Sequence, residues 1–466
     1  MMRIFNIVTL ITLSLFSLSS FANYTLPDYQ KFTLSNGLSI YLMEQKEVPL
    51  IDISVVIKAG AITDNNQAGL NYLTAKNLPL GTQSLSKSAL DNTIDFVGAN
   101  IFSSANLEFV TIGASLASKD SQKILPIVRD IVTAPRFDHD EFTKLKQRHL
   151  LNLQQNKERP SSVINNYFNQ LIFGKQGYGS VVRGDSQSIE QMTLEQITQH
   201  YQHWYQPSNS AVIVVGDFDS QKMKRQLTQL FSGWKNTKKV VAKTVVKTAK
   251  AQKPAVVLVN KADARQSTFL IGGKGIARSD ENRVGLSVIN TILGARFTSW
   301  LNDELRVNAG LTYGARSRFS SYSQDGSFAI STFTKTETTV EAIDLALKTY
   351  ARLWEKGIDE QTLASAKAYV KGQFPPKFET STELASLLVN MYGYQFDESY
   401  INTFEQQVDS LSVEKTKQLI SQYFPQNNLQ FVVIGHADSL RDKLAKYGEI
   451  SEVNIKGVGF NIKEEN

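Results

Sequence analysis

The sequence predicts an α+β fold made of two homologous α/β units, each a mostly antiparallel or mixed sheet with helices packed on one face. Three observations support this fold class: a strand–strand–helix order that occurs twice, a constant spacing between matching residues, and similar ends of the two halves. Gly69-Leu70 and Gly285-Leu286 are 216 residues apart, and Gly98-Ala99 and Gly314-Ala315 have the same spacing. Because several matches share one register, the chain is expected to contain an internal repeat.

Each half begins with two strand-like segments and a helix-like segment. The front half reads FTLSNGLSIYLMEQ, LIDISVVIKAG and AGLNYLTAKNL, and the back half reads PAVVLVNKAD, STFLIGGKG and RVGLSVINTIL in the same order. Alternating β-branched residues predict the strands, and Asn36-Gly37 predicts a turn within the first segment. The short connection between segments 32–44 and 51–59 predicts that these two pair antiparallel.

The two halves also end alike, in residues 197–219 and 416–438. Each of these stretches reads as an amphipathic helix, an aromatic and Pro-Asn turn, a buried strand and a glycine with an acidic turn. The Lys-rich segment 235–253 predicts an extended linker between an N-terminal unit (23–234) and a C-terminal unit (254–466), with a polyanion-binding arm as its alternative role. Further helices are expected over residues 119–133, 138–156, 160–173, 338–356, 359–373 and 381–392.

Residues 1–22 have the features of a cleavable export signal. Arg3 precedes an apolar run, and Ser20 and Ala22 supply small residues before the expected cleavage after Ala22. An uncleaved membrane anchor is the alternative, and no later apolar run approaches the roughly 18 residues needed to cross a bilayer. An exported chain without cysteine fits a bacterial periplasm and excludes thiol catalysis and thiolate metal sites. The net charge of +6 is too small to indicate a nucleic-acid-binding protein.

An ordered series of short motifs covers nearly the whole mature chain: SNGL, VPLIDISVVIKAG, AGL, LPLGT, RPSS, GYG, YQPSNSAVIVVGD, FSGW and, after the linker, LGARFTSWLNDELRVNAGLTYG. This order resembles the insulinase or pitrilysin family of zinc peptidases. More narrowly, it is similar to the bacterial two-repeat subunits related to the mitochondrial processing peptidase.

Active members of that family carry H-x-x-E-H on the helix after the Gly-Leu pair, where two histidines bind Zn²⁺ and the glutamate activates water. The matching stretch here is GLNYLTAKNLPLGT, which has Tyr72 and Lys76 at the histidine positions and Ala75 at the glutamate position. The family's remaining acidic ligand is expected at Leu151 or Asn152. The resemblance therefore implies that this chain binds no zinc and has no other cofactor, because an ammonium group repels a dication and a methyl group accepts no proton.

No other catalytic or metal site is predicted. His200 and His203 could share a helix face but have no acidic residue in register, and His139, His149 and His436 are expected to be isolated surface or core residues. The GGKG stretch at 272–275 lacks the frame of a phosphate-binding loop and predicts a strand end and turn. The sequence contains no G-x-S-x-G nucleophile elbow.

The back half retains the family's Arg…Gly-Leu-x-Tyr segment as Arg306 and Tyr313. The resemblance implies that these residues bind the substrate backbone and stabilise the oxyanion, for which a guanidinium and a phenol are suitable donors. The alternative is that Arg306 pairs with Asp303 or Glu304 while Tyr313 packs in the core. Arg296 stands where the family has a flexible glycine.

The resemblance thus implies a non-catalytic subunit that binds unfolded peptide and supplies Arg306 and Tyr313 to the active site of an H-x-x-E-H partner chain. That partner would hold the zinc, while Tyr72 and Lys76 would face the peptide and Leu70 and Leu73 would keep the helix packed. One alternative is a homodimeric or scaffold-bound peptide-binding module with no role in proteolysis. Another is an autonomous peptidase with an unrecognised site.

Overall fold

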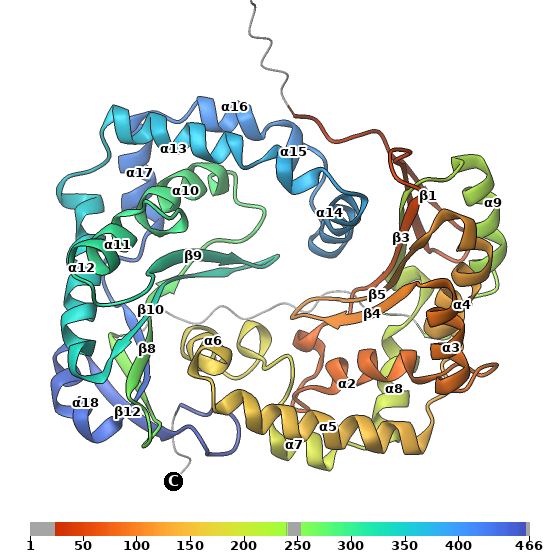
Figure 1. The fold of residues 1–466 in the computed structure, drawn as a ribbon, viewed down its shortest axis with the longest axis horizontal. Helices are drawn as coiled ribbons and strands as arrows, with labels where there is room; N and C mark the ends of the chain where they lie inside the picture. The colour runs from red at the N-terminus through yellow and green to blue at the C-terminus, as the bar shows by residue number, and fades with distance from the viewer. Residues whose placement is uncertain (1–23, 239, 241–252, 463–466) are drawn as a thin grey trace, which may run out of the picture.

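Two six-stranded mixed sheets, one from each half of the chain, form the framework of the protein (Figure 1). The computed structural model describes residues 24–238, 240 and 253–462. The predicted export signal and most of the predicted linker lie outside these residues. The strands of sheet 1 are β1 (Gln30–Thr33), β2 (Ser39–Glu44), β3 (Leu50–Ile57), β4 (Asn100–Ala105), β5 (Val110–Ala117) and β6 (Ser210–Gly216), and those of sheet 2 are β7 (Ala255–Asn260), β8 (Gln266–Lys274), β9 (Arg316–Ser321), β10 (Gly326–Lys335), β11 (Gln430–Gly435) and β12 (Glu449–Asn454).

The strand orders of the two sheets show the repeat. Sheet 1 runs β1-β2-β6-β3-β5-β4, and sheet 2 runs β12-β7-β11-β8-β10-β9. Strand β6 lies between β2 and β3, parallel to β2 and antiparallel to β3, and β11 lies in the same way between β7 and β8. The prediction that β2 and β3 pair directly is therefore wrong. All residues of β6 are buried, and such an apolar strand is more stable at the centre of a sheet than at its edge.

A hairpin at the start of sheet 1 confirms the predicted turn. The carbonyl of Leu34 accepts the N–H of Gly37, and the N–H of Leu34 donates to the carbonyl of Leu38. Gly37 has a φ of 90°, which a glycine adopts without steric cost. The paired strands β1 and β2 follow directly from this turn.

The helices lie between the strand groups, close to where the sequence predicts them. None of those in the described part of the chain is both long and apolar enough to cross a bilayer. The helices are α2 (Leu70–Asn77), α3 (Lys87–Val97), α4 (Ser121–Thr133), α5 (His139–Lys157), α6 (Pro160–Phe173), α7 (Ser186–Gln191), α8 (Leu194–Trp204), α9 (Ser220–Phe231), α10 (Arg283–Asn290), α11 (Trp300–Asn302), α12 (Thr339–Glu355), α13 (Glu360–Gly372), α14 (Ser381–Tyr394), α15 (Ser399–Asn402), α16 (Phe404–Asp409), α17 (Val413–Tyr423) and α18 (Ala437–Leu444).

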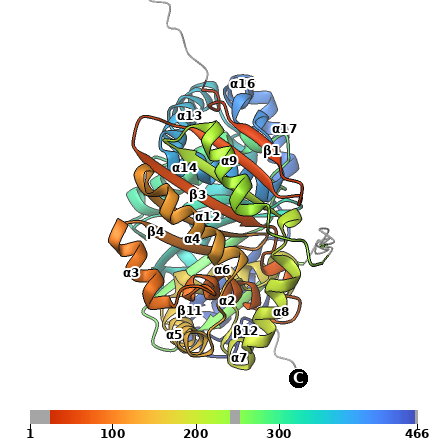
Figure 2. The same cartoon turned by 90° about the vertical axis from the view of Figure 1, so that its right-hand side faces the viewer.

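Each sheet has one face covered by its own half and the other covered by a helix of the opposite half. Ile53 and Val55 of β3 face α4 and α9, which cross the outer side of sheet 1 in Figure 2. On the inner face, Val56 packs in one core with α14 of the C-terminal half. In the same way, α6 of the N-terminal half packs on β8 and β11 of sheet 2. Burial on both faces explains why the central strands are almost continuously apolar.

A polar and aromatic contact also joins the two halves beside these helices. The rings of Tyr178 and Tyr322 are stacked with centroids 4.5 Å apart. The carboxylate of Glu108 accepts the hydroxyl of Tyr178 at 2.9 Å and the backbone N–H of Ser323 at 3.1 Å. This contact and the exchanged helices hold the halves together as one body.

Candidate functional site

Helix α2, which contains the residues that the resemblance matched to the zinc-binding motif, has its start fixed by a glycine and a buried carboxylate. Gly69 has a φ of 89°, and a Cβ added there would lie only 2.9 Å from the Cα of Gly184. The carboxylate of Asp64 accepts the backbone N–H groups of Gly69 at 3.0 Å and Asn71 at 2.8 Å. Burial raises the pKa of Asp64 well above its usual range, although these two donors lower it.

One face of α2 is apolar, as predicted. Leu70 and Leu73 pack with Phe142, Ile189 and Ile197 in a small core. Ala75 has no exposed surface and belongs to the main core of the N-terminal half. A side chain at position 75 is therefore directed into packed protein and away from any ligand space.

Tyr72 and the basic residue Lys76 lie close to two other basic residues, His149 and Arg183. The Tyr72 ring lies 4.8 Å from the His149 ring, and its centroid is 5.7 Å from Nζ of Lys76 and 5.8 Å from Cζ of Arg183. The Lys76 ammonium donates to the carbonyl of Ser103, and Nε2 of His149 is 2.8 Å from the carbonyl of Arg183. We call these four residues the Tyr72 cluster.

The electrostatics of the Tyr72 cluster oppose a bound cation. Burial lowers the pKa of Lys76, and the charge of Arg183 lowers it further. Burial also lowers the pKa of His149, with smaller contributions from Arg183 and Lys76. In the part of the chain that the structure describes, no three His, Asp or Glu side chains gather as a metal site would require. The donors present at this helix do not fit zinc, which needs several neutral or anionic ligands.

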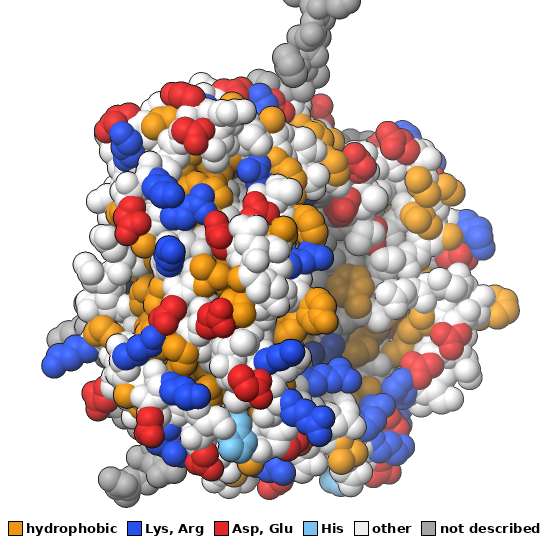
Figure 3. Space-filling model, turned by 60° about the vertical axis from the view of Figure 1, so that its left-hand side comes forward, with side chains coloured by type: hydrophobic (Ala, Val, Ile, Leu, Met, Phe, Trp, Pro, Cys, Tyr) orange, Lys and Arg blue, Asp and Glu red, His pale blue; other side chains and the backbone are white. Residues whose placement is uncertain are grey.

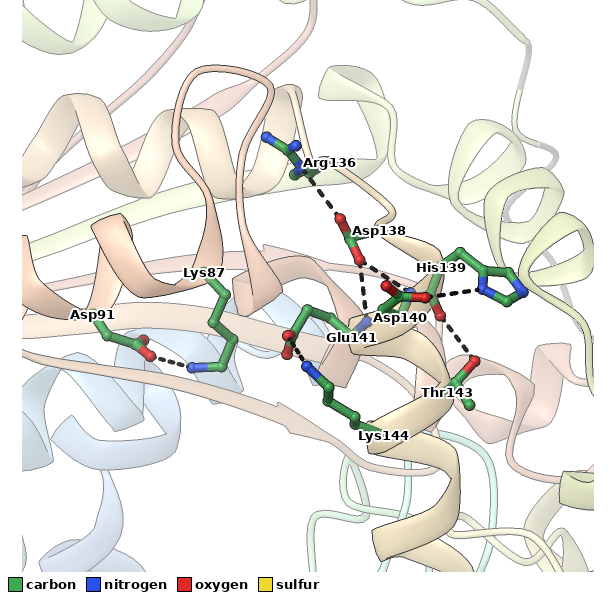
Figure 4. A network of polar contacts seen from close by, with 9 residues as sticks. All are labelled: Lys87, Asp91, Arg136, Asp138, His139, Asp140, Glu141, Thr143 and Lys144. Atoms are coloured by element: carbon green, nitrogen blue, oxygen red, sulfur yellow. Dashed lines mark hydrogen bonds and ion pairs between the residues drawn. The ribbon is translucent and has the colours of Figure 1, made fainter.

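Helix α5 brings His149 to the cluster. Figure 4 shows how α5 begins: the carboxylate of Asp138 accepts the N–H groups of Asp140 at 3.0 Å and Glu141 at 3.2 Å. The hydrogen bond from Glu141 lowers the pKa of Asp138 more than any other contact does. His139, exposed at this start, lies 3.5 Å from Asp140 and far along the helix from His149.

The expected position of the lost acidic ligand needs correction. Leu151 is 59% exposed and Asn152 is also exposed, so neither faces α2. His149, expected to be isolated, is 4% exposed and contacts Tyr72. The signal was present in the sequence, because Phe142, His149 and Leu153 follow the helical period that marks the inward face of α5.

The remaining histidine pair does not form a site. His200 is buried and His203 is exposed, so the two side chains point into different environments. Burial lowers the pKa of His200 to about 3, and its Nε2 has no hydrogen-bond partner among the described residues. The His203 ring makes an edge contact with the Trp204 ring, with centroids 4.9 Å apart.

Arg306 follows shortly after α11 and Tyr313 precedes β9, so both belong to the C-terminal half. Figure 1 shows α11 on the opposite side of the molecule from α2. Tyr313 is 82% exposed, so the alternative of a core tyrosine is wrong. The guanidinium of Arg306 lies 4.6 Å from the centroid of the Phe297 ring, while Glu304 pairs with Arg352 at 3.1 Å. Neither Arg306 nor Tyr313 contacts the Tyr72 cluster within this chain.

Arg296, at the position where a flexible glycine was expected, ties its loop to a helix. One of its guanidinium nitrogens donates to the hydroxyl of Ser365 on α13 at 3.0 Å. The GGKG stretch ends a strand as predicted, since β8 continues through Gly272 and Gly273 to Lys274.

A cavity of about 1670 Å³ lies between α6 and the C-terminal half. Strands β8, β9 and β10 and helix α10 form its other walls, and we call it the α6–β9 cavity. Tyr72, Lys76, Arg306 and Tyr313 do not line it, whereas Phe333, whose ring centroid is 6.3 Å from that of Tyr313, does. None of the residues in its wall was predicted as a site from the sequence.

Two family models match the chain. Residues 40–186 match "Insulinase (Peptidase family M16)", and residues 191–370 match "Peptidase M16 inactive domain". The two models describe consecutive parts of one family and together span most of the chain.

Curated relatives of two kinds are similar to it. The "Uncharacterized zinc protease YmxG" of Bacillus subtilis is 21% identical over 77% of this chain and 86% of its own length. The "Non-peptidase homolog YmxG" of Helicobacter pylori is 21% identical over 81% of this chain and 87% of its own length.

Solved structures share the fold. The "peptidase M16 inactive domain" of Pseudomonas fluorescens has a TM-score of 0.81 and 22% identity, covering 88% of this chain and 98% of that one. The "periplasmic protease PqqL" of Escherichia coli has a TM-score of 0.72 and 19% identity, covering 89% of this chain but 46% of that longer chain. At these identities the likeness establishes the two-unit fold alone.

Proposed function

Because the chain belongs to the insulinase (M16) family of peptidases, we propose that it is a non-catalytic, peptide-binding subunit that works with a zinc-peptidase chain of the same family. The Tyr72 cluster carries this proposal. It brings together Lys76, Arg183 and His149 where an active member needs zinc ligands, and it contains no carboxylate. Ala75, in the core, offers no base for a water molecule.

The exposure of Arg306 and Tyr313 supports a role in trans. Tyr313 is 82% exposed and Arg306 is partly exposed, and the two large apolar neighbours Phe297 and Val307 are 67% and 65% exposed. Exposed apolar side chains that gather in this way mark interaction surfaces. A partner that covers this segment would exclude water from the guanidinium and phenol, which strengthens their hydrogen bonds to a developing oxyanion.

Family membership supports a pair of chains, since M16 members work as pairs. The partner would carry H-x-x-E-H and the zinc, and the peptide would lie between the two chains. In that assembly Tyr72 and Lys76, both partly exposed, would contact the peptide and not a metal.

Export to the periplasm is part of the proposal. It rests on the signal-like residues 1–22 and on the periplasmic location in the name of the Escherichia coli relative PqqL.

A peptide-binding or scaffold module without a role in proteolysis is the second candidate. The exposed side chains of Phe297, Val307 and Tyr313 favour it equally, because an interaction surface serves a scaffold as well as a peptidase. An autonomous peptidase with an unrecognised site is the third.

Reconstitution tests the proposal. The purified chain is mixed with an exported H-x-x-E-H chain of the family, and peptide hydrolysis and complex mass are measured. We expect activity only from the mixture. Arg306→Ala or Tyr313→Phe should lower its kcat by roughly 100-fold, as for the loss of one oxyanion donor. Arg225→Ala, an exposed change on α9, is the matched control and should have no effect.

Full activity of the partner chain alone would exclude the proposal that this chain is a non-catalytic subunit needed for proteolysis. A stable complex without a gain in hydrolysis would favour the scaffold module. Chelator-sensitive hydrolysis by this chain alone would favour the autonomous peptidase.

A further inference from the structure

The α6–β9 cavity is strongly basic. Its wall contains seven Lys and Arg side chains and a single carboxylate, that of Asp263. Figure 3 shows the surface hollowed between the two lobes, with several Lys and Arg side chains below the hollow. The basic residues are Lys261, Arg265, Arg278, Arg283, Arg316, Arg318 and Lys377.

Only one of these charges is neutralised by an ion pair. Lys261 lies 2.8 Å from Asp263 and 2.9 Å from Glu158. Across residues 24–238, 240 and 253–462, the other six make no ion pair with a carboxylate. The field inside the cavity is therefore positive, and the low dielectric of its apolar walls strengthens it.

Two of the six are held by aromatic rings. The guanidinium of Arg278 lies 4.1 Å from the Tyr394 centroid, and that of Arg283 lies 3.2 Å from the Tyr400 centroid. Arg283 also donates to the carbonyl of Tyr400 at 2.8 Å. Rings and carbonyls fix a guanidinium in place without cancelling its charge.

Arg316 and Arg318 lie on the same face of β9, and neither forms an ion pair with a carboxylate of the described residues. Both are exposed, and residues two apart in a strand point the same way with a spacing of roughly 6.6 Å. That spacing matches acidic side chains at alternate positions of an extended peptide.

Nearby acids offset part of the charge at one end of this wall. Burial raises the pKa of Glu108 and the charge of Arg278 lowers it. Arg278 and Arg283 also line an adjoining pocket of about 620 Å³ that contains Asp280, Glu281 and Asp397. Arg316 and Arg318 do not line that pocket and make no ion pair with a carboxylate among the described residues.

We propose that the α6–β9 cavity binds acidic peptide segments in extended form, with Arg316 and Arg318 pairing to carboxylates at alternate positions. This inference rests on the proposed peptide-binding function and names its substrate class. The cavity is larger than the roughly 300–1,000 Å³ of small-molecule sites, which favours a polymer. Apolar wall residues such as Phe168, Phe374 and Phe404 favour a polypeptide over a nucleic acid.

Fluorescence anisotropy of labelled peptides tests the proposal. Three twelve-residue peptides carry Glu, Lys or Gln at alternate positions of one neutral sequence, and a single-stranded oligonucleotide is the fourth probe. We expect the Glu peptide to bind at least tenfold more tightly than the others and to weaken as salt rises. Arg316→Gln/Arg318→Gln should abolish that preference, whereas Lys222→Gln/Arg225→Gln on α9, with the same loss of charge, should keep it.

A charge-reversal variant shows whether the loss of preference in the Gln variant arises from misfolding. Arg316→Glu/Arg318→Glu should turn the preference toward the Lys peptide, a gain that an unfolded protein cannot show. Equal binding of the three peptides would overturn this inference and leave the peptide-binding function standing. Binding of no peptide would overturn both. Tighter binding of the oligonucleotide, or equal losses in the α9 control, would also contradict an acidic-peptide site.

Discussion

The ring of Tyr72 on α2 lies 4.8 Å from the imidazole of His149 on α5, with the two planes tilted by 30°. In this way α5 presents a histidine, and not a carboxylate, to the helix that carries zinc ligands in active relatives. His149 is therefore the α5 side chain that contacts Tyr72, whereas Leu151 and Asn152 are exposed.

That relationship predicts how zinc binding can be restored. Tyr72→His/Lys76→His supplies two imidazoles one turn apart, and adding His149→Glu should supply a third ligand from α5. Because Leu151 points to solvent, Leu151→Glu in the same background is the matched control. Competition with a chromophoric chelator should show at least tenfold tighter zinc binding with His149→Glu. Equal affinities would show that α5 has been assigned the wrong face.

Gly69 should tolerate no side chain. At φ 89°, Gly69→Ala costs about 1–2 kcal/mol of backbone energy, and its Cβ would meet Gly184 and Ile189. Gly98 has a φ of 65° but nothing within 4 Å of an added Cβ, so Gly98→Ala incurs the backbone cost alone. Urea unfolding should show the larger loss for Gly69→Ala. Equal losses would exclude the close approach of the two glycines as its cause.

His200 should make stability depend on pH. Its pKa of about 3 lies below the unfolded value near 6.5, so between these values the unfolded state binds one more proton. Stability attributable to His200 is complete above pH 6.5 and falls by roughly 1.4 kcal/mol per unit as the pH drops. His200→Gln should reduce the slope of unfolding free energy between pH 7 and 5, and exposed His203→Gln should not. An unchanged slope in His200→Gln would contradict the buried, neutral imidazole.

Glu108 should stabilise the contact between the halves. Glu108→Ala leaves the buried donors of Tyr178 and Ser323 without their acceptor, at a cost of about 2–4 kcal/mol. Glu190→Ala, at an exposed carboxylate, is the control. Chemical denaturation followed by the fluorescence of the four tryptophans would measure both. A cost near zero for Glu108→Ala would mean that the exchanged helices alone hold the halves together.

The local features of the fold could be predicted from the sequence. The helix expected over 138–156 is α5 at His139–Lys157, and the Asn36-Gly37 turn closes the β1–β2 hairpin. Periodicity and turn chemistry are local signals, so the helices and turns that they predict do not depend on tertiary packing. The insertion of β6 between β2 and β3 and the exchange of α6 and α14 are not local. They depend on which helix or strand packs on which apolar face of a sheet. Because both halves have similar apolar faces, the sequence does not distinguish between the possible pairings.

The candidate site also has some features that could be predicted from the sequence and others that required the structure. The absence of zinc ligands at residues 72, 75 and 76 was visible in the sequence. The approach of Arg183 to Tyr72 was not, because Arg183 comes from a loop 111 residues away along the chain. The exposure of Tyr313 and the basic wall of the α6–β9 cavity likewise required the three-dimensional arrangement.

Zinc analysis of the isolated chain tests the central claim most directly. The mature protein is incubated with one equivalent of Zn²⁺, dialysed and measured by plasma mass spectrometry, with a known H-x-x-E-H chain as the positive control. A lysine, a phenol and a buried methyl group should leave less than about 0.1 zinc per chain. Close to one zinc per chain, lost on Tyr72→Phe or His149→Ala, would contradict the account.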